Sequence, residues 1–230
     1  MKPTTTGLLF ILIATQRVVC ANFNDANWVS LSAFPGANGT VYAMVTNASS
    51  GVLYIGGSFN VVGTTVAASV AQWDGTNWSS LGSGLGGTIR ALAVDSAGNV
   101  YGGGAFTNVA LGATNVAKWD GSTWSGLGFG MKGTILGLAV DGAGTVYAGG
   151  NFTNSSLMAT NIAQWQGGTW SPMGFGMNNN VFTLAVDGSG NVYAGGDFTL
   201  ADGASANSVA EWNGSGWSSV GAGMNGSLLL

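Results

Sequence analysis

Three aspartates at matching positions are the residues whose type and spacing come nearest to a chemical site in this chain. Asp95, Asp141 and Asp187 each open a glycine-containing turn, such as the stretch Asp187-Gly-Ser-Gly-Asn191. Oxygen-rich turns could contribute to calcium binding, but Ca²⁺ takes about six to eight oxygen ligands and each turn offers one carboxylate. Asp and Asn also cap turns by bonding to their own backbone. We predict this structural role, and calcium binding at the three turns stays open.

Groups suited to acid–base catalysis are scarce. The chain has no histidine and a single glutamate, whereas general acid–base catalysis needs a positioned His, Glu, Asp or Lys. That glutamate, Glu211, takes a position held in equivalent stretches by Gln72, Lys118 and Gln164, so we expect it to face solvent. A glycosidase needs two carboxylates at one bond, and no such pair stands out. We therefore predict no enzyme activity, no catalytic residue, no cofactor and no metal site.

A sequence repeat must position these turns. The motif Tyr-x-Gly-Gly-x-Phe occurs four times, and each copy is followed by Ala-x-Trp, a polar turn and Trp-Ser. The tyrosines are 47, 46 and 46 residues apart, at Tyr54, Tyr101, Tyr147 and Tyr193. Each repeat holds four strand-like stretches separated by turns rich in Gly, Asn and Asp. Four antiparallel strands in a repeat of this length describe one blade of a β-propeller.

The predicted fold is therefore all-β, a β-propeller of four-stranded antiparallel blades. Four complete blades are expected at about residues 40–85, 88–131, 134–177 and 181–224. Residues 27–31 match an isolated fourth strand, and residues 226–230 match the opening of another first strand. We expect an open or incompletely closed array, either an arc or a fragment of a longer chain. A closed ring of five positions with one skeletal blade is the alternative.

Glycine pairs and tryptophan pairs are expected to determine how neighbouring blades pack. The pairs Gly56-Gly57, Gly103-Gly104, Gly149-Gly150 and Gly195-Gly196 interrupt apolar strands, and glycine inside a strand marks a bulge or a close approach of another backbone. Trp119 and Trp124 should lie across one hairpin, where cross-strand aromatic pairs stabilise a sheet. We predict that the tryptophans form the core between blades. A glycan-stacking role predicts instead that tryptophans are exposed on one rim.

The N-terminus indicates export. Residues 7–14 are apolar, follow Lys2 and are too short to span a bilayer, and Ala21 ends an acceptable cleavage site. We predict a signal peptide at residues 1–21 and a secreted or cell-surface protein, with the periplasm and a lipoprotein acylated at Cys20 as alternatives. Cleavage leaves three basic and nine acidic residues, too few cations for nucleic-acid binding. No second segment reaches the length of a membrane span.

Comparison of the repeats separates two rims. Turns between first and second strands, and between third and fourth strands, repeat almost unchanged on one rim. The loops at residues 60–68, 107–114, 153–160 and 199–207 differ and belong to the other, variable rim. Binding residues are disproportionately found on loops that a rigid scaffold positions. The candidate binding residues are therefore those of the variable rim and its inter-blade connections: Leu111, Lys132, Leu157, Met158, Asn179 and Asp202.

The repeats resemble the Tyr-x-Gly-Gly-x-Phe-Thr, Ile-Ala-x-Trp-Asp-Gly and Trp-Ser-x-Leu-Gly-x-Gly motifs of secreted and cell-surface bacterial propellers, loosely kelch-like and delta-60-like. Here the resemblance is carried by residues 146–153, 161–165 and 170–177 with their counterparts, and it covers residues 27–230. It implies the architecture and no particular activity.

The function predicted from the sequence is that of an exported, non-enzymatic binding or structural module. It would engage a protein or a glycan through the variable rim, at the cell surface or in the extracellular space. The alternative is a fragment of a polysaccharide-acting hydrolase or lyase whose catalytic residues lie outside this chain, on the remaining blades of a longer protein.

Overall fold

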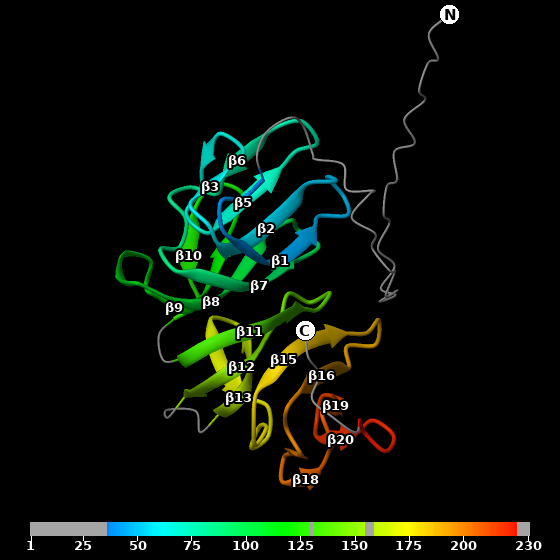
Figure 1. Ribbon diagram of the computed structural model, residues 1–230. Coiled ribbons are helices and arrows are strands. Elements are labelled where there is room, and N and C mark those ends of the chain that lie inside the picture. Colours follow the sequence, from blue (N-terminus) through cyan, green and yellow to red (C-terminus); the bar gives the residue numbers. More distant parts are fainter. Residues whose placement is uncertain (1–35, 129–130, 155–158, 225–230) are drawn as a thin grey trace, which may run out of the picture.

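The computed structural model describes residues 36–128, 131–154 and 159–224, and four four-stranded antiparallel sheets dominate it (Figure 1). Apart from the short 3-10 helix η2 (Val109–Leu111), every regular element in the described part of the chain is a strand. The predicted all-β propeller of four-stranded blades is thereby confirmed. The expected signal peptide, the terminal stretches 27–31 and 226–230, and candidates Leu157 and Met158 lie outside the described residues.

The strands of each blade follow one another in chain order. Blade 1 consists of β1 (Thr40–Thr46), β2 (Leu53–Ser58), β5 (Val70–Trp73) and β6 (Trp78–Ser80). Blade 2 consists of β7 (Thr88–Val94), β8 (Val100–Asn108), β9 (Ala113–Trp119) and β10 (Trp124–Gly126). Blade 3 consists of β11 (Lys132–Val140), β12 (Val146–Asn154), β13 (Ala159–Gln166) and β14 (Thr169–Pro172). Blade 4 consists of β15 (Val181–Val186), β16 (Val192–Gly196), β19 (Val209–Trp212) and β20 (Trp217–Ser219).

The first strands form the inner line of the array. β1 packs against β7, β7 against β11, and β11 against β15, and Figure 1 shows these four strands in succession through the middle of the molecule. Each first strand carries a register shift opposite the glycine pair, as between Ile135 and Gly137 in blade 3. The shift recurs in blades 1, 2 and 4. A bulge of this kind bends and twists the strand.

The two glycines of a pair do different things. A Cβ on the second glycine of blade 3, Gly150, would collide with the carbonyl oxygen of Thr134 on the blade's own first strand. A Cβ on the first glycine, Gly149, would instead lie 2.5 Å from Cγ1 of Val181 on blade 4. Gly56 and Gly103 accept Ile89 and Ile135 of the following blade in the same way. One glycine therefore permits the bulge, and the other is the socket for the next blade.

Tryptophan pairs complete the joints between blades. Trp119 and Trp124 are directly opposed across their hairpin, with ring centroids 5.6 Å apart, and each other blade has an equivalent pair. The predicted cross-strand pairing is confirmed. The Trp124 indole nitrogen also donates a hydrogen bond of 2.8 Å to the carbonyl oxygen of Leu81 in the preceding blade. Trp170 and Trp217 make the same bond to Leu127 and Met173.

Candidate functional site

The described residues of the variable rim form regular strands and hairpins. In blades 1 and 4, the loop between the second and third strands folds into a small hairpin, β3 (Val61–Val62) with β4 (Thr65–Val66) and β17 (Leu200–Ala201) with β18 (Ala204–Ser205). In blades 2 and 3 the second and third strands themselves continue outward instead. The rim therefore has two kinds of loop, where the sequence predicted only variation.

The two kinds of loop also differ in a left-handed residue, which lies within the third strand in blades 2 and 3 and directly before it in blades 1 and 4. Blades 2 and 3 have Asn115 and Asn161 there, at φ of 64° and 63°, and blades 1 and 4 have Ser69 and Ser208, at 69° and 63°. The Asn115 side chain accepts a hydrogen bond of 2.8 Å from the Phe106 amide. Its Nδ2 donates to the carbonyl oxygens of Met131 and Gly133 at 2.6 and 2.8 Å. The side-chain amide of Asn115 therefore links β8 and β9 of blade 2 to the chain segment where blade 3 begins.

Asparagines outside the loops hold the two small hairpins. In blade 1, Oδ1 of Asn38 accepts hydrogen bonds of 3.0 Å from the amides of Asn60 and Val61, and its Nδ2 donates to Oδ1 of Asn60 at 2.5 Å. In blade 4, Oδ1 of Asn178 accepts hydrogen bonds of 2.9 Å from the amides at residues 199 and 200. Side-chain amides thus position the variable loops, which suits a preformed binding surface.

A hollow of about 510 Å³ opens on this rim between blade 1 and the connection to blade 2. Hydroxyl and amide side chains dominate its polar lining, and no lining residue has an ionisable side chain. The lining residues are Asn38, Ser58, Phe59, Asn60, Ala68, Ser69, Gly86, Gly87 and Thr88. Ser58 and Asn60 are exposed. We call this feature the rim hollow; its geometry suits an uncharged ligand that exchanges hydrogen bonds with hydroxyls and amides.

The predicted binding residues that lie in the described part of the chain are not grouped at one place. Leu111 ends η2 and is half-buried, whereas Asn179 is exposed and donates to the carbonyl oxygen of Asp197 at 3.4 Å. Lys132 was expected in an inter-blade connection, but it is the exposed first residue of β11, which begins before the predicted blade boundary at about residue 134. Asp202 lies at the turn of the β17–β18 hairpin. Its Oδ1 accepts a 2.7 Å hydrogen bond from the amide of Phe175.

One rim carboxylate was missed by the sequence analysis. Oδ1 of Asp197 is the buried side-chain atom that has no hydrogen-bond partner among the described residues. Asp197 directly follows the glycine pair of blade 4, at a position held by Ser58, Ala105 and Asn151 in the other blades. Its replacement of uncharged residues was the available signal. A single carboxylate does not supply the pair that a glycosidase requires.

The aspartate turns on the opposite, uniform rim are filled by hydrogen-bond donors. Oδ1 of Asp95 accepts from the amides of Ala97 and Asn99, and its Oδ2 accepts from the Asn99 side chain and the Tyr101 hydroxyl. Partial burial acts to raise the pKa of Asp95, but these hydrogen bonds outweigh it and hold the pKa below its usual value. Among the described residues, no group of three acidic, His or Cys side chains is placed to hold a metal ion.

The hydroxyl partners of these aspartates show the converse shift. Tyr147 donates to Oδ2 of Asp141 at 3.0 Å. Burial, followed by this hydrogen bond and the negative charge of Asp141, raises the pKa of Tyr147 to about 12. The predicted capping role of the turns is therefore visible in the geometry, whereas calcium binding, which the sequence left open, is not tested.

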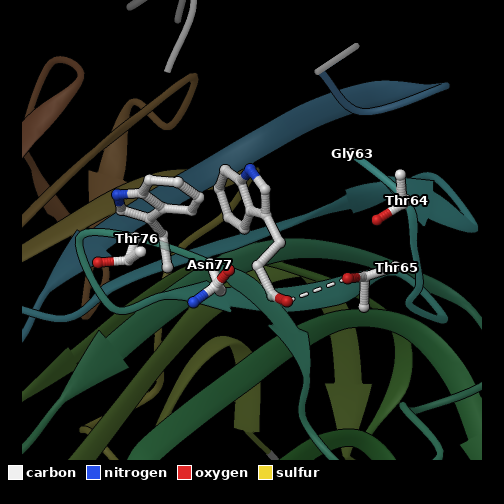
Figure 2. A pocket seen from close by; sticks show the side chains of 7 residues that line it. Gly63, Thr64, Thr65, Thr76 and Asn77 are labelled. Atoms are coloured by element: carbon white, nitrogen blue, oxygen red, sulfur yellow. Dashed lines mark hydrogen bonds between the residues drawn. The ribbon is translucent and has the colours of Figure 1, made fainter. Parts of the chain in front are cut away.

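A second, smaller hollow of about 140 Å³ lies at the outer edge of blade 1 (Figure 2). Thr64 and Thr65 border it on one side and Thr76 and Asn77 on the other, and the Thr65 hydroxyl donates to the carbonyl oxygen of Trp78 at 3.0 Å. Trp73 and Trp78 complete the lining and are half-buried. Five other tryptophans are buried, at positions 119, 124, 170, 212 and 217. The predicted role in the core therefore holds for these five.

No protein-family model and no curated protein matches this chain. Among solved structures, YCF48 bound to D1 peptide is similar with 14% identity and a TM-score of 0.51, over 84% of this chain and 57% of the other. The extracellular domain of the putative one component system BT4673 from B. thetaiotaomicron is 13% identical, with a TM-score of 0.46, over 69% and 20%.

The GH74 xyloglucanase from Xanthomonas campestris is also 13% identical, with a TM-score of 0.40, over 77% of this chain and 31% of the other. The chain thus spans less than two thirds of each of these structures. Within the described residues, no helix is long and apolar enough to cross a membrane. Together with the four blades, the likeness to YCF48 shows a β-propeller fold.

Proposed function

We propose that this protein is an exported, non-enzymatic β-propeller module that binds a glycan through its variable rim. The rim hollow carries the proposal, because its polar groups are the hydroxyls of Ser58, Ser69 and Thr88 with the amides of Asn38 and Asn60. Groups of this kind exchange hydrogen bonds with a neutral polar ligand. Phe59 and the glycines add an apolar floor, as ligand sites typically combine apolar surface with a few placed polar groups.

The same chemistry argues for binding rather than catalysis. Hydrolysis of a glycosidic bond needs an acid and a second carboxylate on either side of that bond, and the residues lining the rim hollow include no carboxylate. Asp202 lies away from the rim hollow, at the β17–β18 hairpin of blade 4, where its Oδ1 accepts a hydrogen bond from the Phe175 amide. Hydroxyls and side-chain amides at the rim can orient a ligand but do not transfer protons efficiently near neutral pH.

A protein segment is the second candidate ligand. YCF48 has a similar fold and was solved bound to D1 peptide, and a peptide backbone is also neutral and rich in hydrogen-bonding groups. Export is supported by the leader-like sequence at residues 1–21. It is tested by determining the N-terminus of the protein released into the medium.

An array of immobilised oligosaccharides and polysaccharides tests the proposal. The mature chain should bind a defined subset, and Ser58→Tyr should abolish that binding because the ring fills the rim hollow. The matched control is Ser96→Tyr, at an exposed position of the uniform rim, which should bind like the wild type. Equal loss in both variants, or no binding by the wild type, contradicts the glycan proposal. Release of new reducing ends from a bound polysaccharide contradicts the non-enzymatic role.

A further inference from the structure

Blade 1 exposes apolar side chains that are covered in every later blade. Val41 and Met44 on β1 are 37% and 70% exposed. Their counterparts point into the joint with the preceding blade, where Ile89, Ile135 and Val181 are fully buried at the Val41 position. At the Met44 position, Leu138 and Leu184 are buried and Leu92 is half-buried. We call this side of blade 1, with Val41, Met44, Trp73 and Trp78, the leading face.

Blade 4 also exposes apolar side chains, on the side that faces away from blade 3. Val220 and Met224 are 38% and 48% exposed. The residues at the Val220 position in the earlier blades are buried under the next blade: Leu81, Leu127 and Met173. The same holds at the Met224 position for Leu85, Met131 and Met177. We call this side of blade 4, with Tyr193, Val209, Val220 and Met224, the trailing face.

Within the chain, a leading face always meets a trailing face through the same contacts. A branched side chain of the first strand lies against the first glycine of the preceding pair, as Ile135 does against Gly103. Residues of both blades then close one apolar cluster, as Tyr101, Val116 and Leu127 do with Trp170. The joint is completed by an indole hydrogen bond to a backbone carbonyl. Three such joints exist in the described structure.

The two free faces carry complementary halves of this joint. The leading face has the branched Val41 and the indole of Trp78, whose nitrogen has no hydrogen-bond partner among the described residues although its three counterparts each have one. The trailing face has Gly195 at the socket position and the carbonyl of Val220 at the position of the acceptors Leu81, Leu127 and Met173. Neither free face would therefore need a new kind of contact to be covered by the other.

We propose that two copies of this chain associate head to tail, the leading face of each against the trailing face of the other. Two four-bladed arcs then form one closed ring of eight blades, at the upper end of the usual range of about four to eight. Heterologous contacts of this kind produce a ring when the rotation between copies closes. Burial of Met44, Val41, Val220 and Met224 provides the hydrophobic driving force. The proposal is independent of glycan binding at the rim.

Mass measurements by sedimentation velocity over the micromolar range test the association. The mature wild-type chain should have twice the monomer mass, and Met44→Asp and Met224→Asp should each halve it, because each buries a carboxylate in the joint. Both side chains are exposed within one chain, so neither substitution should impair folding. The control is Ser125→Asp, which adds the same charge at an exposed position on the outer strand of blade 2 and should remain dimeric.

Mixing the two interface variants identifies the geometry. Met44→Asp retains an intact trailing face and Met224→Asp an intact leading face, so an equimolar mixture should form dimers through one joint although each variant alone is monomeric. Association of like faces predicts instead that one of the two variants stays dimeric by itself, which overturns the proposal. A wild-type monomer at all concentrations overturns it too.

Discussion

Gly149→Ala probes the socket between blades 3 and 4. The added Cβ would lie 2.5 Å from Cγ1 and 3.0 Å from Cβ of Val181, whereas carbon atoms in contact are separated by about 3.5–4.0 Å. Val181 is fully buried, and its β-branched side chain has few alternative rotamers. The two blades must therefore move apart. Overpacking of this kind costs about 1–3 kcal/mol, and a loss of about 2 kcal/mol lowers the Tm of a domain this size by about 4–8 °C.

Thermal unfolding followed by circular dichroism measures this loss against two controls. Gly142→Ala adds the same methyl group at a turn position where no atom lies within 4 Å and where blade 2 already has Ser96, so its Tm should match the wild type. Val181→Ala removes the colliding methyl groups. The double variant Gly149→Ala with Val181→Ala should therefore be more stable than the sum of the single losses predicts.

The reasoning about the socket is refuted if Gly149→Ala and Gly142→Ala have the same Tm. It is also refuted if the stability losses of Gly149→Ala and Val181→Ala add to give the loss of the double variant. Either result would mean that the blades can separate without cost and that the first glycine of each pair does not determine their spacing.

Three further changes test other parts of the fold. Trp124→Phe should destabilise the protein by about 1–3 kcal/mol more than Trp165→Phe in denaturant unfolding, because only Trp124 leaves a buried carbonyl, that of Leu81, without its indole donor; equal losses contradict this. Asn115→Gly accepts the positive φ but loses three hydrogen bonds, so it should cost more than Ser69→Gly, and hydrogen exchange near residues 106 and 131 should accelerate. Tyr147→Phe should remove a stability loss at alkaline pH. Because folding raises the Tyr147 pKa from 10.0 to about 12, its contribution is present below pH 10 and disappears as the pH approaches 12, where wild-type and variant stabilities should converge; parallel pH profiles contradict this.

The blade architecture could be predicted from the sequence because each blade repeats the same short-range pattern of strand and turn residues. Trp119 and Trp124 are separated by a short polar turn, which places them opposite each other in any antiparallel hairpin, and the structure pairs them so. The glycine pair signalled a close approach, but the sequence alone did not separate its two uses. That division depends on the bulge in the first strand, which brings the Thr134 carbonyl against Gly150 and leaves Gly149 for the next blade.

The rim was harder to predict because its shape comes from contacts distant in the chain. Asn38 holds the β3–β4 hairpin from 22 residues away, and nothing in the sequence of the loop itself reveals that contact. The candidates were chosen because they vary between repeats, and this criterion selected residues of the variable loops but not those that line the rim hollow. Ser58 and Ser69 were overlooked because small polar residues at strand ends resemble ordinary turn residues.

The central claim is that the variable rim binds ligand, whereas the uniform rim belongs to the scaffold. Amide hydrogen exchange tests it most directly, measured on the mature protein with and without the oligosaccharide that gives the strongest array signal. Bound ligand should slow amide exchange at residues 58–60, 68–69 and 86–88, which surround the rim hollow. Exchange at the aspartate turns, residues 95–99, 141–145 and 187–191, should stay unchanged. Protection confined to those turns, with none around the rim hollow, would contradict the account.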